Sequence, residues 1–229
     1  MNKVVKTLIS LVLLAVIVGL TYKIVQSVQE PVKFNKHVDA RKEVAVQRLK
    51  DIRTLQVAYK TVNGKFTADF DSLAQFYRNG EMEVVMQIGS NDDSLAVANT
   101  QALRKKNAKI TPQEMYALYQ QGQSLVFSIV NKVAVKDTLF NNRSDFNVDS
   151  LKYIPFSGKQ MVEMEAVEKM VSGVSVPLFE AKMPYKKLCK GLDNQLRINL
   201  DAACRASNRY EGLQVGSITA PNNNAGNWE

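Results

Sequence analysis

The feature that most constrains this chain is an uncharged apolar segment near its start, TLISLVLLAVIVGLTY, between Lys6 and Lys23. As a helix, Thr7–Tyr22 would span roughly 24 Å, slightly less than a hydrocarbon core of about 30 Å. Lysine side chains at both ends can reach the lipid surface, and the apolar residues that follow lengthen the segment. We therefore predict one membrane-spanning helix over residues 7–29, with membrane lipid as its partner.

Two fates of this segment fit the sequence. A signal peptide would be cleaved after small residues, and Val25-Gln26-Ser27 is an acceptable site. The long valine-rich run and the helix-compatible KIVQSVQ after it favour an uncleaved signal anchor instead. The pair Glu30-Pro31 is then expected to end the helix, because proline lacks an N–H and restricts the residue before it. Residues 30–37 are predicted to form a short tether.

The distribution of charge indicates a lipid surface and not a nucleic acid. The net charge is +8, and residues 1–36 contribute +4 of it, from five lysines against Glu30. Half of the excess thus flanks the apolar segment, where lysines orient and anchor a helix. We expect residues 1–6 to be a cytoplasmic start and the domain to be exported, which predicts a single-pass protein of a bacterial inner membrane with a periplasmic domain.

An amphipathic helix is predicted from about residue 38 to residue 62. Its apolar residues recur at spacings of three and four, which places them on one stripe. The stripe consists of Ala45, Leu49, Ile52, Leu55, Tyr59 and Val62. It either packs on the protein's own domain or faces a protein partner, and fewer than three clean heptads argue against a coiled coil.

Turn and cap signals divide the next part of the chain. Asn63-Gly64 ends the long helix, because both residues tolerate the left-handed conformation. Asp69 or Asp71 caps a second helix, Ser72–Arg78, which Asn79-Gly80 is expected to close in the same way. The valine-rich EVVMQIG at residues 83–89 predicts a strand.

Residues 90–110 are polar and weakly patterned, so we expect a long loop or a mobile insertion there. Thr111, Pro112 and Glu114 form a capping-box pattern, which predicts a helix of about ten residues ending at Gly122.

The second half of the chain is rich in β-forming residues. Strands are expected within Ser124–Phe140, Val171–Tyr185 and Gly212–Ile218, and a helix with a break near Gly191 within Lys186–Ser207. Helices first and strands later indicate an α+β fold with a mostly antiparallel, β-rich exported domain over residues 38–220. Residues 221–229 form a polar tail, for which disorder is favoured over docking through Trp228, the only tryptophan.

The chemistry-bearing residues exclude several enzyme classes. His37 is the only histidine, so zinc sites with several histidines and Ser-His-Asp sites away from residue 37 are excluded. No GxSxG, GxGxxG or GxxxxGK[ST] motif is present. We predict no catalytic residue, no cofactor and no metal site; a hydrolase that uses carboxylates alone is the remaining enzymatic alternative.

Cys189 and Cys204 are the only cysteines. In one straight helix they would lie roughly 22 Å apart, but a break at Gly191 allows a helical hairpin that brings them together. An exported domain reaches an oxidising compartment. A disulfide between these residues and two buried free thiols are therefore the two alternatives.

The segment RLKDIRTLQVAYKTVNGKF, Arg48–Phe66, follows an N-terminal hydrophobic helix and resembles the pseudopilins and type IV pilin-like proteins. The matching residues within about residues 38–72 are Gln56, Ala58, Tyr59, Asn63, Gly64 and Phe66. The chain departs from that group in having no glycine-phenylalanine cleavage site before the hydrophobic helix and no glutamate at the fifth position after it. Processing by a prepilin peptidase and polymerisation into a fibre are therefore not part of the expectation. The whole pattern resembles an uncharacterised family of bacterial membrane-anchored proteins, which implies no activity.

Together these observations predict a membrane-anchored, non-catalytic structural or adaptor subunit of a bacterial envelope assembly, related to secretion or pili. It would contact a protein partner through the stripe or the tail. The alternative is a membrane-anchored module that binds a ligand or the cell wall.

Overall fold

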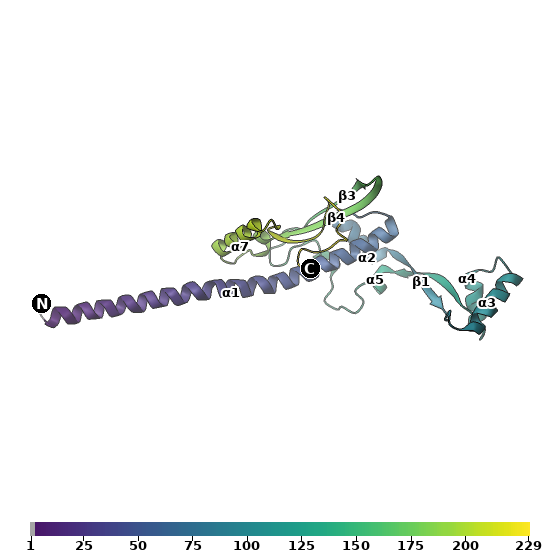
Figure 1. The fold of residues 1–229 in the computed structure, drawn as a ribbon, viewed down its shortest axis with the longest axis horizontal. Helices are drawn as coiled ribbons and strands as arrows, with labels where there is room; N and C mark the ends of the chain where they lie inside the picture. Colours follow the sequence, from purple (N-terminus) through teal and green to yellow (C-terminus); the bar gives the residue numbers. More distant parts are fainter. Residues whose placement is uncertain (1–2) are drawn as a thin grey trace. The chain divides into compact units, whose positions relative to one another are not determined.

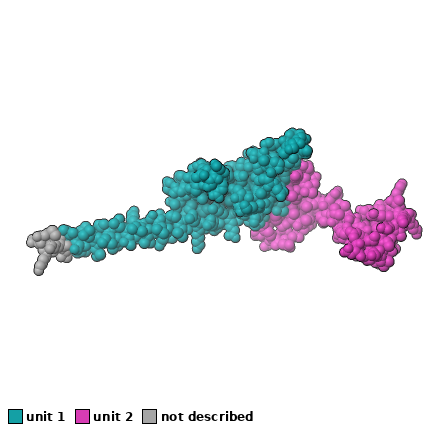
Figure 2. Space-filling model, in the orientation of Figure 1, with its two compact units in different colours: residues 1–54, 66–68, 149–229 teal, residues 55–65, 69–148 magenta. Residues whose placement is uncertain are grey.

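The computed structural model describes residues 3–229 and has an α+β fold with a long N-terminal apolar helix and antiparallel sheets, as predicted (Figure 1). The first two residues of the predicted start at 1–6 lie outside the described part. Contacts divide the chain into two units, coloured separately in Figure 2. Unit 1 comprises residues 1–54, 66–68 and 149–229, and unit 2 comprises residues 55–65 and 69–148.

The helices are α1 (Lys3–Asn63), α2 (Phe70–Asn79), α3 (Ser94–Lys106), α4 (Pro112–Gln120), α5 (Val135–Thr138), the 3-10 turn η1 (Val148–Ser150), α6 (Tyr185–Leu188) and α7 (Asn194–Ala206). The strands are β1 (Glu81–Ile88), β2 (Phe127–Ala134), β3 (Glu163–Val171), β4 (Val174–Pro184) and β5 (Gly212–Gly216).

Helix α1 is unbroken, so the predicted tether at residues 30–37 is wrong. Pro31 lies inside the helix, where its missing N–H removes one hydrogen bond of the backbone ladder. Phe34 and Val38, on the next turns, are already buried against the rest of the chain. The stabilisation that comes from burying these side chains outweighs the loss of one backbone hydrogen bond, so the helix continues.

In unit 1, two arginines of α1 donate hydrogen bonds to α6, to the turn that follows it and to the segment around Tyr153. Arg41 donates from Nη1 to the carbonyl oxygens of Leu188 (2.9 Å) and Lys190 (2.8 Å). Arg48 donates to the carbonyl oxygen of Tyr153. These bonds give the three carbonyl groups a donor from α1, and they fix the face that α1 presents to the unit.

The sheet of unit 1 has the order β3-β4-β5, with both pairings antiparallel. Strands β3 and β4 are joined by Ser172 and Gly173, both with positive φ (50° and 82°), as a tight two-residue hairpin requires. Strand β3 was not predicted, because charged residues alternate with half-buried ones in its first part and none of its residues is fully buried. The predicted strand at Gly212–Ile218 is confirmed as β5.

In unit 2, β1 and β2 pair as an antiparallel two-stranded ribbon. Helices α2 and α5 lie at one end of it and α3 and α4 at the other (Figure 1). At the second end a small core forms around Met115, Leu125, Phe127 and Ile129. The predicted capping box is confirmed: Thr111 accepts from the Glu114 N–H, and Glu114 accepts from the Thr111 N–H.

The prediction of a loop or mobile insertion at residues 90–110 is wrong, because residues 94–106 form α3. Asp93 caps it by accepting hydrogen bonds from the N–H groups of Leu95 and Ala96. Ala96 and Thr100 are the buried residues of this helix, and the Thr100 hydroxyl accepts from the Val126 N–H at 2.8 Å. A helix that buries so little carries a weak apolar pattern.

The two Asn-Gly turns differ. Gly64 has φ +75° after α1, as predicted. Gly80 after α2 has φ −76°, so the left-handed conformation expected there is wrong. A side chain at residue 80 would collide with the carbonyl oxygen and ring of Phe76. Glycine is needed at this turn for space and not for a special backbone conformation.

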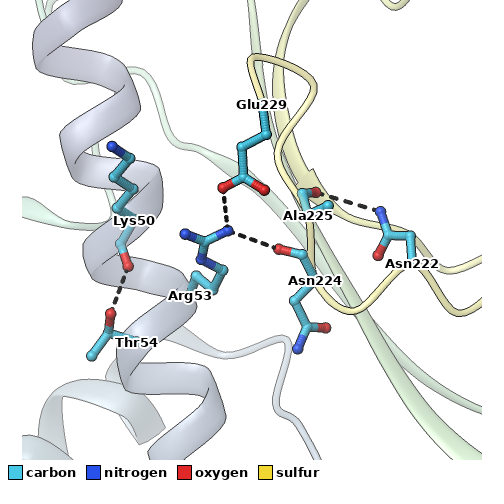
Figure 3. A network of polar contacts seen from close by, with 7 residues as sticks. All are labelled: Lys50, Arg53, Thr54, Asn222, Asn224, Ala225 and Glu229. Carbon is cyan, nitrogen blue, oxygen red and sulfur yellow. Dashed lines mark hydrogen bonds and ion pairs between the residues drawn. The ribbon is translucent and has the colours of Figure 1, made fainter.

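The tail at residues 221–229 is docked on unit 1, which corrects the expectation of disorder. Asn227 exchanges backbone and side-chain hydrogen bonds with Gln214 and Gly212 of β5. Arg53 of α1 contacts Asn224 and Glu229 (Figure 3). Trp228 lies against Gly226, where a Cβ would collide with its indole. Hydrogen bonds to an exposed strand edge thus hold a segment that has almost no apolar residues.

Candidate functional site

The N-terminal part of α1 carries a long run of exposed apolar side chains. Every described side chain from Leu8 to Glu30 is exposed, and Figure 2 shows this part of unit 1 as a bare rod. Among the described residues, this helix is long and apolar enough to cross a membrane. Its burial by lipid would remove from water an apolar surface that the chain itself leaves uncovered.

The predicted stripe on α1 is mostly not available to a partner, which corrects that expectation. Ala45, Leu49, Ile52 and Leu55 are fully buried within the chain. Tyr59 is half-buried, with its ring packed edge-on against Phe76 at 5.3 Å between centroids. Only the last stripe residue, Val62, is exposed. The 3.6-residue period reflects packing on the protein's own core.

The ribbon β1–β2 exposes apolar side chains on both faces. Val85 and Val130 are opposite each other in the register and are 65% and 48% exposed. Val84 and Met86 are exposed on the other face. In the described part of the chain neither strand has a second neighbour, so each outer edge presents backbone groups that can pair with another strand. The sequence predicted a strand at residues 83–89, but it did not predict that apolar side chains would be exposed on both faces of the ribbon.

A cavity of about 530 Å³ lies in unit 1, between the end of β4, one face of α7 and the loop before β5. Its lining residues are Pro184, Lys186, Arg197, Ile198, Asp201, Arg205, Arg209, Tyr210 and Glu211. Residues 197, 201 and 205 recur at a spacing of four, which puts them on one face of α7. The same spacing was visible in the sequence, but nothing there pointed to residues 184–186 and 209–211 as the opposite wall.

Four of the charged side chains that line this cavity form two ion pairs. Arg197 pairs with Asp201 through Nη1 and Oδ2, and its Nε and Nη2 both donate to Asn194 Oδ1. Arg205 pairs with Glu211 at 2.8 Å. Asp201 Oδ1 is buried and has no hydrogen-bond partner in the described part of the chain. Burial raises the pKa of Asp201, although Arg197 partly opposes this effect.

Both cysteines are buried next to this region and carry free thiols. Cys189 directly follows α6 and Cys204 lies on α7, and these two short helices pack on each other. Burial raises the pKa of the Cys189 thiol. Burial is also the main cause that raises the pKa of Tyr185 to about 12, and both cysteines add to it. The fold therefore brings the two predicted residues into one neighbourhood.

No described group of three or more histidine, cysteine, aspartate or glutamate residues could hold a metal ion. His37 is exposed on α1. A scan of known protein families finds no model that matches the chain, and neither the curated proteins nor the solved structures contain a match.

Proposed function

We propose that the protein is a membrane-anchored, non-catalytic structural or adaptor subunit of a bacterial envelope assembly. The observation that carries the proposal is the bare apolar part of α1, which continues without a break into the part packed on unit 1. Residues 7–29 span the inner membrane once, as an uncleaved signal anchor. The residues before them are cytoplasmic, and residues 38–229 are exported to the periplasm.

The length of α1 supports this placement. At about 1.5 Å per residue, residues 7–29 form roughly 35 Å of helix, which is enough for a hydrocarbon core of about 30 Å. Because α1 does not stop at Pro31, the domain follows the membrane segment on the same helix. The only charge in this stretch is Lys23, whose long side chain can reach the lipid surface.

The ribbon β1–β2 replaces the stripe as the surface proposed for a protein partner. It combines exposed Val85 and Val130 with two free strand edges, a combination that favours addition of a strand from another protein. The resemblance of Arg48–Phe66 to pseudopilins supports an assembly role. A non-catalytic role is proposed because the clustered carboxylates of the cavity, Asp201 and Glu211, are each paired with an arginine.

Site-specific photo-crosslinking in intact cells tests this proposal. A photoreactive residue at position 85 is expected to capture one defined envelope protein, whereas the same residue at position 105, exposed on α3, is not. The complex should be lost in the Val85→Asp, Val130→Asp double variant, whose side chains are exposed and not part of the core. Equal adducts from positions 85 and 105, or a complex that the double variant leaves intact, would contradict the proposed partner surface.

A ligand- or cell-wall-binding module is a second candidate function. One observation favours it: the cavity of unit 1 has a volume within the usual range of ligand sites, about 300–1,000 Å³. The two roles are compatible, because the cavity lies in unit 1 and the ribbon in unit 2.

A further inference from the structure

The cavity of unit 1 is built by segments whose positions are fixed by the fold. Pro184 ends β4 and Lys186 lies on α6, while residues 197–205 belong to α7 and residues 209–211 lead into β5. Strands β4 and β5 are paired through Pro184 and Gly212, so the two ends of the cavity wall are joined by the sheet. At Gly212 a side chain would collide with the ring of Tyr210, so this glycine allows the ring to pack there as part of the wall.

The lining carries more positive than negative charge. Four cationic side chains face two carboxylates, and each carboxylate has an arginine partner: Arg197 for Asp201 and Arg205 for Glu211. Lys186 and Arg209 remain, and neither forms an ion pair among the described residues. The cavity therefore has an excess of two positive charges, carried by the exposed side chains of Lys186 and Arg209 on the wall that faces α7.

The lining also offers apolar surface. Ile198 is 38% exposed, and it lines the cavity together with Pro184 and the half-buried Tyr210. Isolated isoleucine side chains on a surface need no explanation, but this one lies beside two cations inside a concavity. A ligand that carries an anionic group and a small apolar body satisfies both parts of the lining.

We propose that this cavity binds a small organic oxyanion, a carboxylate or a phosphate. Lys186 and Arg209 hold the anionic group, and Ile198, Pro184 and Tyr210 contact its apolar part. Arginine suits either anion, because its planar guanidinium donates two parallel hydrogen bonds to a carboxylate or a phosphate. Arg197 is not assigned to the ligand, because its charge is already paired with Asp201 and its Nε and Nη2 donate to Asn194. The proposal deepens the second candidate function by naming the chemistry of the ligand, and it rests on that function.

Calorimetric titration of the full chain in nanodiscs of zwitterionic lipid tests the site. Phenylpropionate and phenyl phosphate are the probes, because they share a ring and differ in the anion. The Lys186→Gln, Arg209→Gln double variant removes two positive charges from the cavity. The Lys159→Gln, Lys190→Gln double variant removes two exposed charges of unit 1 from outside the lining. Unchanged emission of Trp228 in both variants verifies that unit 1 is folded.

We expect at least one probe to bind, and its affinity to fall at least tenfold in the Lys186→Gln, Arg209→Gln variant while the control retains it. The better of the two probes identifies carboxylate or phosphate as the natural anion. Absence of binding by both probes, or equal weakening in the two variants, would overturn the proposal. Binding of the neutral glycan chitotriose alone would overturn the oxyanion site while leaving the ligand-binding module in place.

Discussion

Arg53 of α1 donates from Nη1 to Oε1 of Glu229 at 2.6 Å and so joins the long helix to the last residue of the chain (Figure 3). The same nitrogen is 3.3 Å from the carbonyl oxygen of Asn224. One arginine thus contacts the tail at two points that are 176 and 171 residues away in sequence. The neighbouring Trp228 provides a fluorescent probe of this contact, since the chain has no other tryptophan.

Replacement of Arg53 by glutamine is expected to loosen the tail, because both tail contacts of its guanidinium depend on the positive charge and the Nη1 donor. The emission of Trp228 should move to longer wavelength, and acrylamide should quench it more strongly. Arg104→Gln, an exposed change on α3, serves as the control and should leave both unchanged. Identical quenching in the wild type and in Arg53→Gln would show that β5 alone holds the tail.

Docking of the tail should also depend on pH. The hydrogen bond from Arg53 lowers the pKa of Glu229 below its ordinary value of 4.5. A carboxylate with a lowered folded-state pKa stabilises the folded state above its unfolded pKa and loses this contribution as the pH falls through the folded pKa. Emission of Trp228 is therefore expected to be constant from pH 7 to about 5 and to shift below 4.5. In Glu229→Gln the shift below pH 4.5 should be smaller, because the side chain that accepts the hydrogen bond no longer titrates.

Because the stripe is buried, truncation of one of its side chains is expected to lower the free energy of unfolding strongly. Leu49→Ala should lower the free energy of unfolding by about 2–5 kcal/mol, because it leaves a cavity where a fully buried side chain packed. Val44→Ala on the same helix, where Val44 is 44% exposed, should change it by no more than about 0.5 kcal/mol. Urea titration of the full chain in micelles, followed by Trp228 emission, measures both. If both substitutions changed the free energy of unfolding by the same small amount, the stripe would not be part of the core, and it would again be a candidate partner surface.

Cys189 and Cys204 are free thiols in the structure, on two helical segments that pack on each other. The proposed export to an oxidising compartment is expected to join them in a disulfide. Closure of so short a loop would stabilise the domain by about 3 kcal/mol in the chain-entropy model. Chain denatured without reductant should take up no maleimide-polyethylene glycol, and two copies after reduction. Two adducts without reductant would identify Cys189 and Cys204 as buried free thiols.

Local signals predicted the parts of the fold that depend on neighbouring residues. The capping box at Thr111 needs only residues 111–114, and the stripe on α1 follows from a period within one helix. Helix α3 was missed because only Ala96 and Thr100 of it are buried. Strand β3 was missed because its exposed faces allow charged residues such as Glu165 and Glu168.

The sites depend on contacts that sequence spacing does not reveal. The docked tail needs Arg53 from a helix more than 170 residues earlier. The cavity needs Lys186 and Arg209 together on the wall that faces α7, and their freedom from ion pairs follows only from knowing which carboxylates the other arginines bind. The continuation of α1 past Pro31 similarly depends on the burial of Phe34 and Val38. The general tendency of proline to end a helix does not take such packing into account.

Cysteine accessibility in intact cells tests the proposed membrane topology most directly. In a Cys189→Ala, Cys204→Ala background, single cysteines are placed by Asn2→Cys and by Gln121→Cys, and a small charged maleimide that does not cross the inner membrane is added. We predict labelling of residue 121 before lysis and of residue 2 only after lysis, with both proteins retained in membranes washed with alkaline carbonate. Labelling of residue 121 only after lysis, or release of the protein by the wash, would contradict an inner-membrane anchor with an exported domain.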